Sequence, residues 1–269
     1  MNELKFTGER LTGENSGWIR AEHLHRYALA MEYVKDKKVL DIACGEGYGT
    51  YLLGQNALKV IGVDIDEKVI RFAKEKYKKD NLEFNSGNIE NTGFEDYSFD
   101  VVVSFETIEH LANHAAAMNE IKRILKPDGI LIMSTPDRDK YNFGRIAPNR
   151  FHVHELNFEE YKTLLNQYFE HNEFLFQQST AASFIHSEYP KFFIQFSGNL
   201  ESVSVQQRPD YIYIVSISSN LPFELPPHSI FNDESLFQDK LIFKEKSIDY
   251  KIGKMMLDPL RKIKRWIGR

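Results

Sequence analysis

Short apolar segments alternate with helix-like segments from residue 21 to residue 136. Because the apolar residues fall in short continuous runs, strands are expected at 39–43, 60–63, 82–84, 99–105 and 130–134. Helices are expected before and between them, at 21–33, 48–54, 67–78 and 107–125. Strands that are joined through helices form a mostly parallel sheet with helices on both faces. The alternation therefore predicts an α/β fold with a doubly wound sheet.

The pattern becomes less regular after Pro136. A polar loop is expected at 137–153, a helix from 157 to about 169, and two more strands at 173–176 and 211–216, so the predicted sheet has seven strands. Residues of about 178–210 show no clear period and are assigned to a lid or an inserted hairpin. Because Pro222, Pro226 and Pro227 end the regular pattern, we place one domain at 1–220 and a C-terminal extension at 221–269.

Composition narrows the class of protein. The net charge of −5 over 269 residues gives no reason to expect a nucleic-acid partner. Cys44 is the sole cysteine, so an intrachain disulfide is excluded. The first 30 residues lack the layout of a signal peptide, and no apolar run approaches the roughly 20 residues that cross a bilayer. A cytoplasmic protein is expected.

A glycine-rich turn, Gly45-x-Gly47-x-Gly49, follows the first expected strand. Such a turn lets the backbone approach a nucleotide-like ligand closely, although a tight turn without a ligand has the same pattern. Asp64 ends the second strand and can accept both hydroxyls of a ribose, as in NAD enzymes. The NAD fingerprint, however, places its last glycine where this chain has Thr50, and it does not require Asp41.

Five segments in order resemble class I S-adenosylmethionine-dependent methyltransferases, which have a Rossmann-like fold: VLDIACGEGYGT, VIGVDID, LEFNSGNIENTGF, FDVVVSFETIEHL and ILKPDGILIMSTP. The resemblance covers residues 35–136 strongly and the chain to about 220 more loosely. It implies an S-adenosylmethionine site made of Asp41, Ala43, Gly45, Gly47, Asp64, Ile65, Asn88, Ile89 and Phe105.

Within that implied site, the glycine turn holds the methionine part of the cofactor and Asp64 holds the ribose. Ile65 flanks the adenine, Asn88 stands where the family often has aspartate, and Phe105 lies beside the sulfonium. Aminopropyl transferases and binding-only proteins share parts of this pattern, so a non-methylating protein that binds S-adenosylmethionine remains an alternative.

Two acids and a histidine follow the fourth expected strand. If a helix begins there, Glu106, Glu109 and His110 share one face and could bind a divalent cation. A charged helix start with a solvated His110 would show the same residues. The spacing resembles that of small-RNA terminal 2′-O-methyltransferases and of the ubiquinone-pathway catechol O-methyltransferase.

In the small-RNA enzymes, a later histidine completes the metal site. Here His152 or His154 can fill that place, and His152 is favoured. The expected metal set is therefore Glu106, Glu109, His110 and His152, holding Mg²⁺ or Mn²⁺.

A cation would lower the pKa of an acceptor hydroxyl and chelate two adjacent oxygens, which implies a vicinal diol as acceptor. Glu109, His110 and His154 are the expected catalytic residues, because a carboxylate or an imidazole can take the proton of that hydroxyl. Without a metal, His110 or His154 would be the proton acceptor. The expected reaction is therefore O-methylation, with or without metal assistance.

The overall likeness is to methyltransferases of bacterial cell-surface polysaccharide biosynthesis. The shared parts are Gly8-Glu9-Arg10, the helix at 23–30, and the ACGEGYG, SFETIEHL and FHVHEL segments. The resemblance implies a sugar or glycan acceptor, with a catechol-like small metabolite as the alternative. Arg10 and Arg26 could meet the cofactor carboxylate or a substrate, or could be surface residues.

The C-terminal stretch 251–269 carries seven lysines and arginines against one aspartate. Met256, Leu260, Ile263 and Ile267 recur at helical spacing, which is typical of a basic amphipathic helix. Such a helix could lie on an anionic membrane at the inner face, or dock on its own domain or on a partner. The sequence says nothing about the oligomeric state.

Overall fold

The structure is a computed structural model, and it describes residues 18–142, 149–179, 183–187, 195–198, 203–206 and 211–231. The expected tail helix at 251–269, the segment Gly8–Arg10 and parts of the expected lid lie outside these residues.

The chain alternates strands and helices up to Tyr141. The first elements are α1 (Trp18–Met31), β1 (Lys38–Ile42), α2 (Tyr48–Leu53), β2 (Lys59–Asp64), α3 (Glu67–Lys76) and β3 (Leu82–Ser86). They are followed by β4 (Phe99–Phe105), the short 3₁₀ helix η1 (Ile108–His110), α4 (His114–Ile124), β5 (Leu125–Pro136) and α5 (Arg138–Tyr141).

The second part is mostly strand. It contains α6 (Phe158–Asn166), β6 (His171–Ser179), β7 (Ser183–Ser187), β8 (Gln195–Gly198), β9 (Val203–Gln206), β10 (Tyr213–Ser219) and β11 (Ser229–Phe231). Strands β8 and β9 pair with each other in a separate two-stranded sheet, so the stretch expected to form a lid or hairpin holds β7 and this hairpin.

The central sheet has nine strands in the order β11-β7-β6-β10-β5-β4-β1-β2-β3. Strands β3, β2, β1, β4 and β5 are parallel, whereas β10, β6, β7 and β11 pair in antiparallel fashion. The prediction of seven strands was wrong, because β7 and β11 extend the sheet beyond β6. The sheet is therefore mixed, and it continues past residue 220, where we placed the domain boundary.

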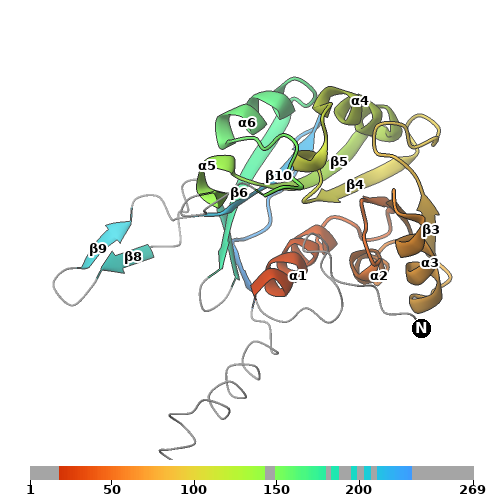
Figure 1. Cartoon of the computed structure of the whole chain (residues 1–269), viewed down its shortest axis with the longest axis horizontal. Coiled ribbons are helices and arrows are strands. Elements are labelled where there is room, and N and C mark those ends of the chain that lie inside the picture. Colours follow the sequence, from red (N-terminus) through yellow and green to blue (C-terminus); the bar gives the residue numbers. More distant parts are fainter. Residues whose placement is uncertain are drawn as a thin grey trace, which may run out of the picture.

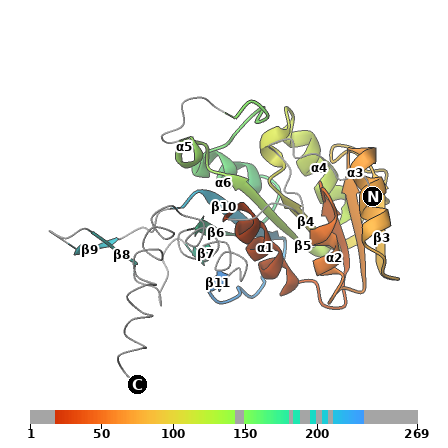
Figure 2. The ribbon, with the colours of Figure 1, turned by 60° about the horizontal axis from the view of Figure 1, so that its bottom comes forward.

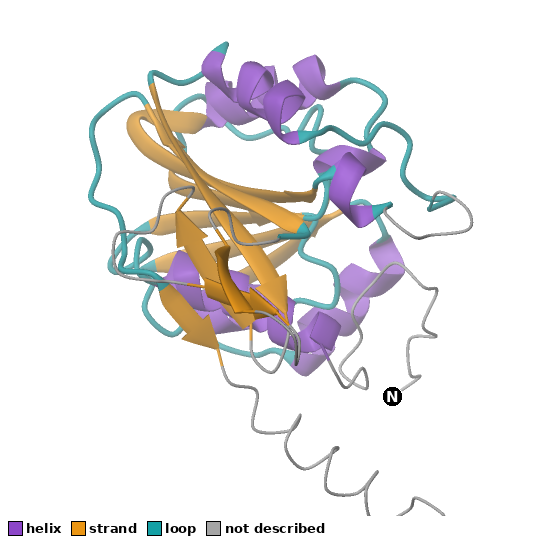
Figure 3. Cartoon of the chain, turned by 90° about the vertical axis from the view of Figure 1, so that its left-hand side faces the viewer, coloured by secondary structure: helices purple, strands orange, loops and turns teal. Residues whose placement is uncertain are grey.

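Helices cover both faces of this sheet, as predicted. Helices α4 and α6 lie on one face, and α1, α2 and α3 lie on the other (Figure 1). Figure 3 shows the sheet between the two helical layers. Each layer encloses its own apolar core: Met118 and Ile121 of α4 are buried on the first side, and Leu29 and Leu53 on the second. None of the described helices has the length and apolarity to span a bilayer.

Strand β11 also packs beside α1 (Figure 2). His25 Nε2 lies 2.9 Å from Ser229 Oγ, and the His25 ring stacks on Phe231 with ring centroids 5.8 Å apart. Helix α1 is therefore held on one side by the far end of the described chain, and on the other side, through Tyr27, by the glycine-rich turn after β1.

The predicted helix at 107–125 was wrong in its first third. Glu106 is the last residue before a turn and has φ of 51°, outside the helical region. The 3₁₀ helix η1 follows, and α4 begins only after Asn113, whose side chain accepts a hydrogen bond from Ala116 N. A turn and a short 3₁₀ helix therefore connect β4 to α4.

Candidate active site

A cavity of about 440 Å³ lies at the carboxyl ends of β1, β2 and β4, against α1. Strands β1 and β4 are neighbours in the sheet, and the chain continues from β1 to β2 on one side and from β4 to β5 on the other. Open α/β sheets bind ligands at such a topological switch point. The cavity is lined by His23, Tyr27, Ile42, Ala43, Cys44, Gly45, Tyr48, Asp64, Ile65, Gly87, Asn88, Ile89, Phe105, Glu106, Thr107, His110, Leu111 and Phe151.

Seven of the nine expected cofactor residues line this cavity: Ala43, Gly45, Asp64, Ile65, Asn88, Ile89 and Phe105. The Asp64 carboxylate is fixed by two backbone amides, since Oδ2 accepts from Gly45 N and Oδ1 accepts from Asp66 N, both at 2.9 Å. It thus connects the end of β2 to the glycine-rich turn and presents an acid to the cavity.

Asp41 and Gly47 are not among the lining residues. The Asp41 carboxylate is 1% exposed and accepts hydrogen bonds from Thr50 Oγ1 at 2.6 Å and from Tyr27 OH at 3.2 Å. Burial raises the pKa of Asp41 to about 7. Gly47 has φ of 84°, and a Cβ there would lie 2.7 Å from the Phe84 ring. Both residues therefore support the conformation of the glycine-rich turn without lining the cavity.

Helix α1 supplies a wall of the cavity that the site prediction missed. A Cβ at Gly49 would lie 1.9 Å from Tyr27 Cζ, so this glycine lets the Tyr27 ring sit directly on the start of α2. Tyr27 makes edge contacts with Tyr48 and Phe105, and Tyr48 OH lies 2.9 Å from His23 Nδ1. The available signal was the shared segment at 23–30, in which we considered a site role for Arg26 but not for His23 or Tyr27.

Glu106 lines the cavity but does not share a helix face with Glu109. Its amide donates to Ser134 O at 3.1 Å, and its Oε1 accepts from Ser134 Oγ at 2.7 Å. Arg26 Nη1 lies 3.7 Å from the same Oε1. The left-handed backbone at Glu106 costs about 1 kcal/mol, which these contacts to β5 and α1 offset.

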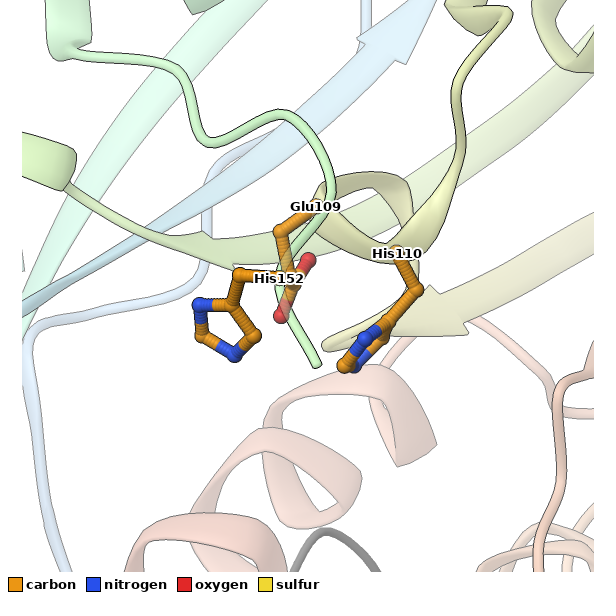
Figure 4. A group of neighbouring side chains, drawn as sticks. All are labelled: Glu109, His110 and His152. Carbon is orange, nitrogen blue, oxygen red and sulfur yellow. The ribbon is translucent and has the colours of Figure 1, made fainter. Parts of the chain in front are cut away.

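Three of the four expected metal ligands come together. One ligand atom from each of Glu109, His110 and His152 lies within 4.8 Å of the others, whereas Glu106 is not part of this group. Figure 4 shows the Glu109 carboxylate between the two imidazole rings. Burial, and then the negative charge of Glu106, raise the pKa of Glu109 well above its usual range.

Oxygen atoms orient both histidines of this cluster. His110 Nδ1 donates to the carbonyl of Phe151 at 3.0 Å, and His152 Nδ1 donates to the Glu155 carboxylate. Both oxygens can only accept, so the ring proton sits on Nδ1 and the lone pair on Nε2. Second-layer oxygens orient histidines that bind metals in this way. In His152, that lone pair already accepts a hydrogen bond from Asn149 Nδ2 at 3.0 Å.

His154 points elsewhere. It is exposed, its ring stacks on His114 with centroids 4.5 Å apart, and it does not line the cavity. The amides of Val153 and His154 both donate to the carbonyl of Glu109, at 2.9 and 3.0 Å. This pair of hydrogen bonds fixes the loop with His152 toward the cluster and His154 away from it.

Arg26 is buried beneath the site, with 1% of its surface exposed. Its Nη1 donates to Gln177 Oε1 at 2.8 Å, and its guanidinium lies 4.9 Å from the centre of the Tyr213 ring. It is not among the residues that line the cavity, so its contact with the site runs through Glu106.

Residues 40–133 match the family model of a methyltransferase domain. The probable S-adenosylmethionine-dependent methyltransferase of Mycolicibacterium smegmatis is 37% identical over 166 residues, 60% of this chain and 63% of its own. A protein of the same name from Mycobacterium tuberculosis is also 37% identical, over 60% of each chain. The chain thus spans about three fifths of these relatives.

Solved structures agree on the fold. The YcgJ protein of Bacillus subtilis has a TM-score of 0.56 at 17% identity, covering 74% of this chain and all of its own. A Thermotoga maritima methyltransferase, whose name adds a possible histamine N-methyltransferase, has a TM-score of 0.55 at 20% identity, covering 75% of this chain and 90% of its own. The chain therefore has a Rossmann-like fold, and its residues 40–133 are similar to the methyltransferase domain of that family model.

Proposed function

We propose that the protein transfers a methyl group from S-adenosylmethionine to a hydroxyl of a vicinal diol, on a sugar of a bacterial cell-surface polysaccharide. The observation that carries this proposal is the cluster of Glu109, His110 and His152, of which His110 lines the cofactor cavity and the other two do not. A carboxylate and two oriented imidazoles beside a methyl donor suit the deprotonation of a hydroxyl.

The lining residues fit the donor. Asp64, already fixed by two amides, would accept hydrogen bonds from the ribose. Ile65, which is 75% exposed, together with Asn88 and Ile89 would flank the adenine. The reacting end of the donor would then face Phe105 and the residues that follow β4.

Glu109, His110 and His152 would hold the divalent cation. Because Mg²⁺ prefers oxygen ligands, two imidazoles favour Mn²⁺ over Mg²⁺. When bound, the cation would lower the pKa of a diol hydroxyl and hold two adjacent oxygens. Without a cation, His110 is the better proton acceptor, because it lines the cavity with its lone pair on Nε2, whereas His154 is exposed.

The names of the relatives do not identify the methyl acceptor of this protein. A Mycobacterium ulcerans relative, 30% identical over 45% of this chain, is a phthiotriol/phenolphthiotriol dimycocerosates methyltransferase. A Lactococcus lactis relative, 37% identical over 35% of this chain, is a demethylmenaquinone methyltransferase. The sugar acceptor therefore depends on the sequence resemblance and on the diol chemistry of the cluster. A catechol-like metabolite and binding without transfer are the alternatives.

A screen with labelled S-adenosylmethionine tests the proposal. Nucleotide sugars, oligosaccharides and catechols are each offered with Mn²⁺, with Mg²⁺ and with a chelator. We expect transfer to a sugar that needs the cation and that Glu109→Gln and His152→Ala abolish. His154→Ala, on the same loop but outside the cluster, is the matched control and should keep activity. Full activity in chelator refutes the cation, and cofactor binding without any transfer favours a binding-only protein.

We also propose that residues 251–269 bring the enzyme to an anionic membrane surface where glycans are assembled. The support is the sequence pattern of basic residues around an apolar stripe. Flotation with vesicles of anionic or of neutral lipid compares the full chain with a chain that ends at residue 250. Only the full chain with anionic vesicles should float, and equal flotation of both chains refutes the proposal.

A further inference from the structure

The metal cluster leaves Glu106 without a role, although its side chain lines the cofactor cavity. Its carboxylate is held by Ser134 Oγ at 2.7 Å, and Arg26 Nη1 lies 3.7 Å away. Both contacts are made by Oε1. The structure thus fixes the Glu106 carboxylate in the wall of the cavity.

The backbone indicates that this placement is specific. Glu106 has φ of 51°, which L residues other than glycine, asparagine and aspartate rarely adopt. Its amide is bonded to Ser134 O at 3.1 Å, so β5 holds the residue in this conformation. A strand that simply continued into a turn would have no need of a glutamate in the left-handed region.

The position of Glu106 along the cavity points to the sulfur of the donor, and here the inference rests on the proposed function. Asp64 and Ile65 mark the nucleoside end, and Gly45 marks the turn that would carry the methionyl part. The sulfur joins these two parts. It would therefore lie near the ends of β1 and β4, beside Phe105 and Glu106.

We propose that the Glu106 carboxylate recognises the positive charge of the sulfonium and so distinguishes the methyl donor from its demethylated product. S-adenosylmethionine carries a cationic sulfur, whereas S-adenosylhomocysteine carries a neutral thioether. A carboxylate inside a partly dehydrated cavity attracts the cation far more than the neutral group. Because transfer of the methyl group removes this attraction, Glu106 contributes less to binding of the product than to binding of the donor.

Calorimetric titration tests this inference without any acceptor. The chain of 269 residues, in chelator, is titrated with S-adenosylmethionine, S-adenosylhomocysteine and sinefungin, an analogue with an ammonium group in place of the methyl sulfonium. The test variant is Glu106→Gln, which keeps the size of the side chain and an oxygen for Ser134. The control is Glu83→Gln on β3, an exposed acid paired with Lys59.

Glu106→Gln should weaken the two cationic ligands on the order of tenfold and leave S-adenosylhomocysteine within about twofold. Retained binding of S-adenosylhomocysteine also shows that the variant is folded. Ser134→Ala, which keeps the charge but removes the hydroxyl, should weaken the cationic ligands by a smaller factor. Equal losses for all three ligands, or no loss, overturn the inference. A wild-type protein that binds none of the three refutes the proposed function itself.

Discussion

Replacing Gly49 by alanine tests how α1 forms a wall of the cofactor cavity. The added Cβ would lie 1.9, 2.2 and 2.4 Å from three carbons of the Tyr27 ring. Carbon atoms do not approach so closely, so the ring must leave its place or α1 must move. Because Tyr27 is buried on α1 and lines the cavity, either movement changes the cofactor site as well as stability.

The cost can be worked from the contacts that a displaced ring loses. These are the hydrogen bond to Asp41 and the two edge contacts with Tyr48 and Phe105. At about 1 kcal/mol for each of the three, Gly49→Ala should lower the free energy of unfolding by about 3 kcal/mol. Tyr27→Ala, which deletes the ring, should cost about 4 kcal/mol. The double variant should cost no more than Tyr27→Ala alone, because the alanine methyl group then enters the space of the ring.

Urea unfolding followed by circular dichroism measures all four proteins of this cycle. A matched cycle pairs Gly49→Ala with Tyr51→Ala, a partly exposed tyrosine of the same helix that contacts Tyr77 instead. That pair should be additive. If the losses in the free energy of unfolding from Gly49→Ala and Tyr27→Ala added up to about 7 kcal/mol in the double variant, the reasoning would be refuted. The Tyr27 ring would then not be the reason why residue 49 must be glycine.

Three further expectations concern buried charge. The pKa of Asp41 is about 7 in the folded state and near 3.8 in the unfolded state, so between these values the folded state binds one more proton and the free energy of unfolding falls as pH rises. The wild-type protein should lose about 2.5 kcal/mol more of this free energy between pH 5 and 8 than Asp41→Asn does. Parallel pH profiles of unfolding for the two proteins would contradict this. Asp64→Asn should weaken S-adenosylhomocysteine binding at least about tenfold by calorimetry, because a neutral amide replaces the acid that binds Gly45 N and is expected to bind the ribose. Arg26→Met should cost about 3 kcal/mol in urea unfolding because it leaves Glu106 without its cation, and a change below about 1 kcal/mol would show that the pair is dispensable.

The local sequence pattern predicted the parallel strands of the sheet but missed β7 and β11 at its antiparallel edge. Strand β4 begins and ends as predicted, because three successive valines lie between Phe99 and Phe105, and a short apolar, β-branched segment favours a buried strand. Strand β5 extends back to Leu125 through Lys126-Pro127-Asp128-Gly129, which has the composition of a turn. Strands β7 and β11 have five and three residues. Strand β7 pairs with β6 directly before it, and β11 joins the sheet only through β7, far back along the chain, so pairing decides the conformation of both strands. No periodicity exists over such lengths.

The candidate site also contains features that the local sequence predicts and features that it does not. The acids and glycines at strand ends were predictable, because ordered strands bring their carboxyl ends to one edge of the sheet. The conformation of Glu106 was not, since sequence gives no sign that a glutamate will adopt the left-handed region. Two backbone hydrogen bonds to the carbonyl of Glu109 place His152 at the cluster and His154 away from it, and the types of side chain in this loop do not reveal such bonds.

The packing of α1 between the two ends of the described chain has a consequence for synthesis on the ribosome. Tyr27 meets Asp41 only 14 residues later, so this contact is available as soon as the first strand emerges. The bond from Arg26 to Gln177 spans 151 residues, and the contact of His25 with Ser229 spans 204. One side of α1 can therefore dock early, while the other side waits for nearly all of the described chain. The helix that forms a wall of the cavity is then held on both sides only once nearly all of the described chain has been made.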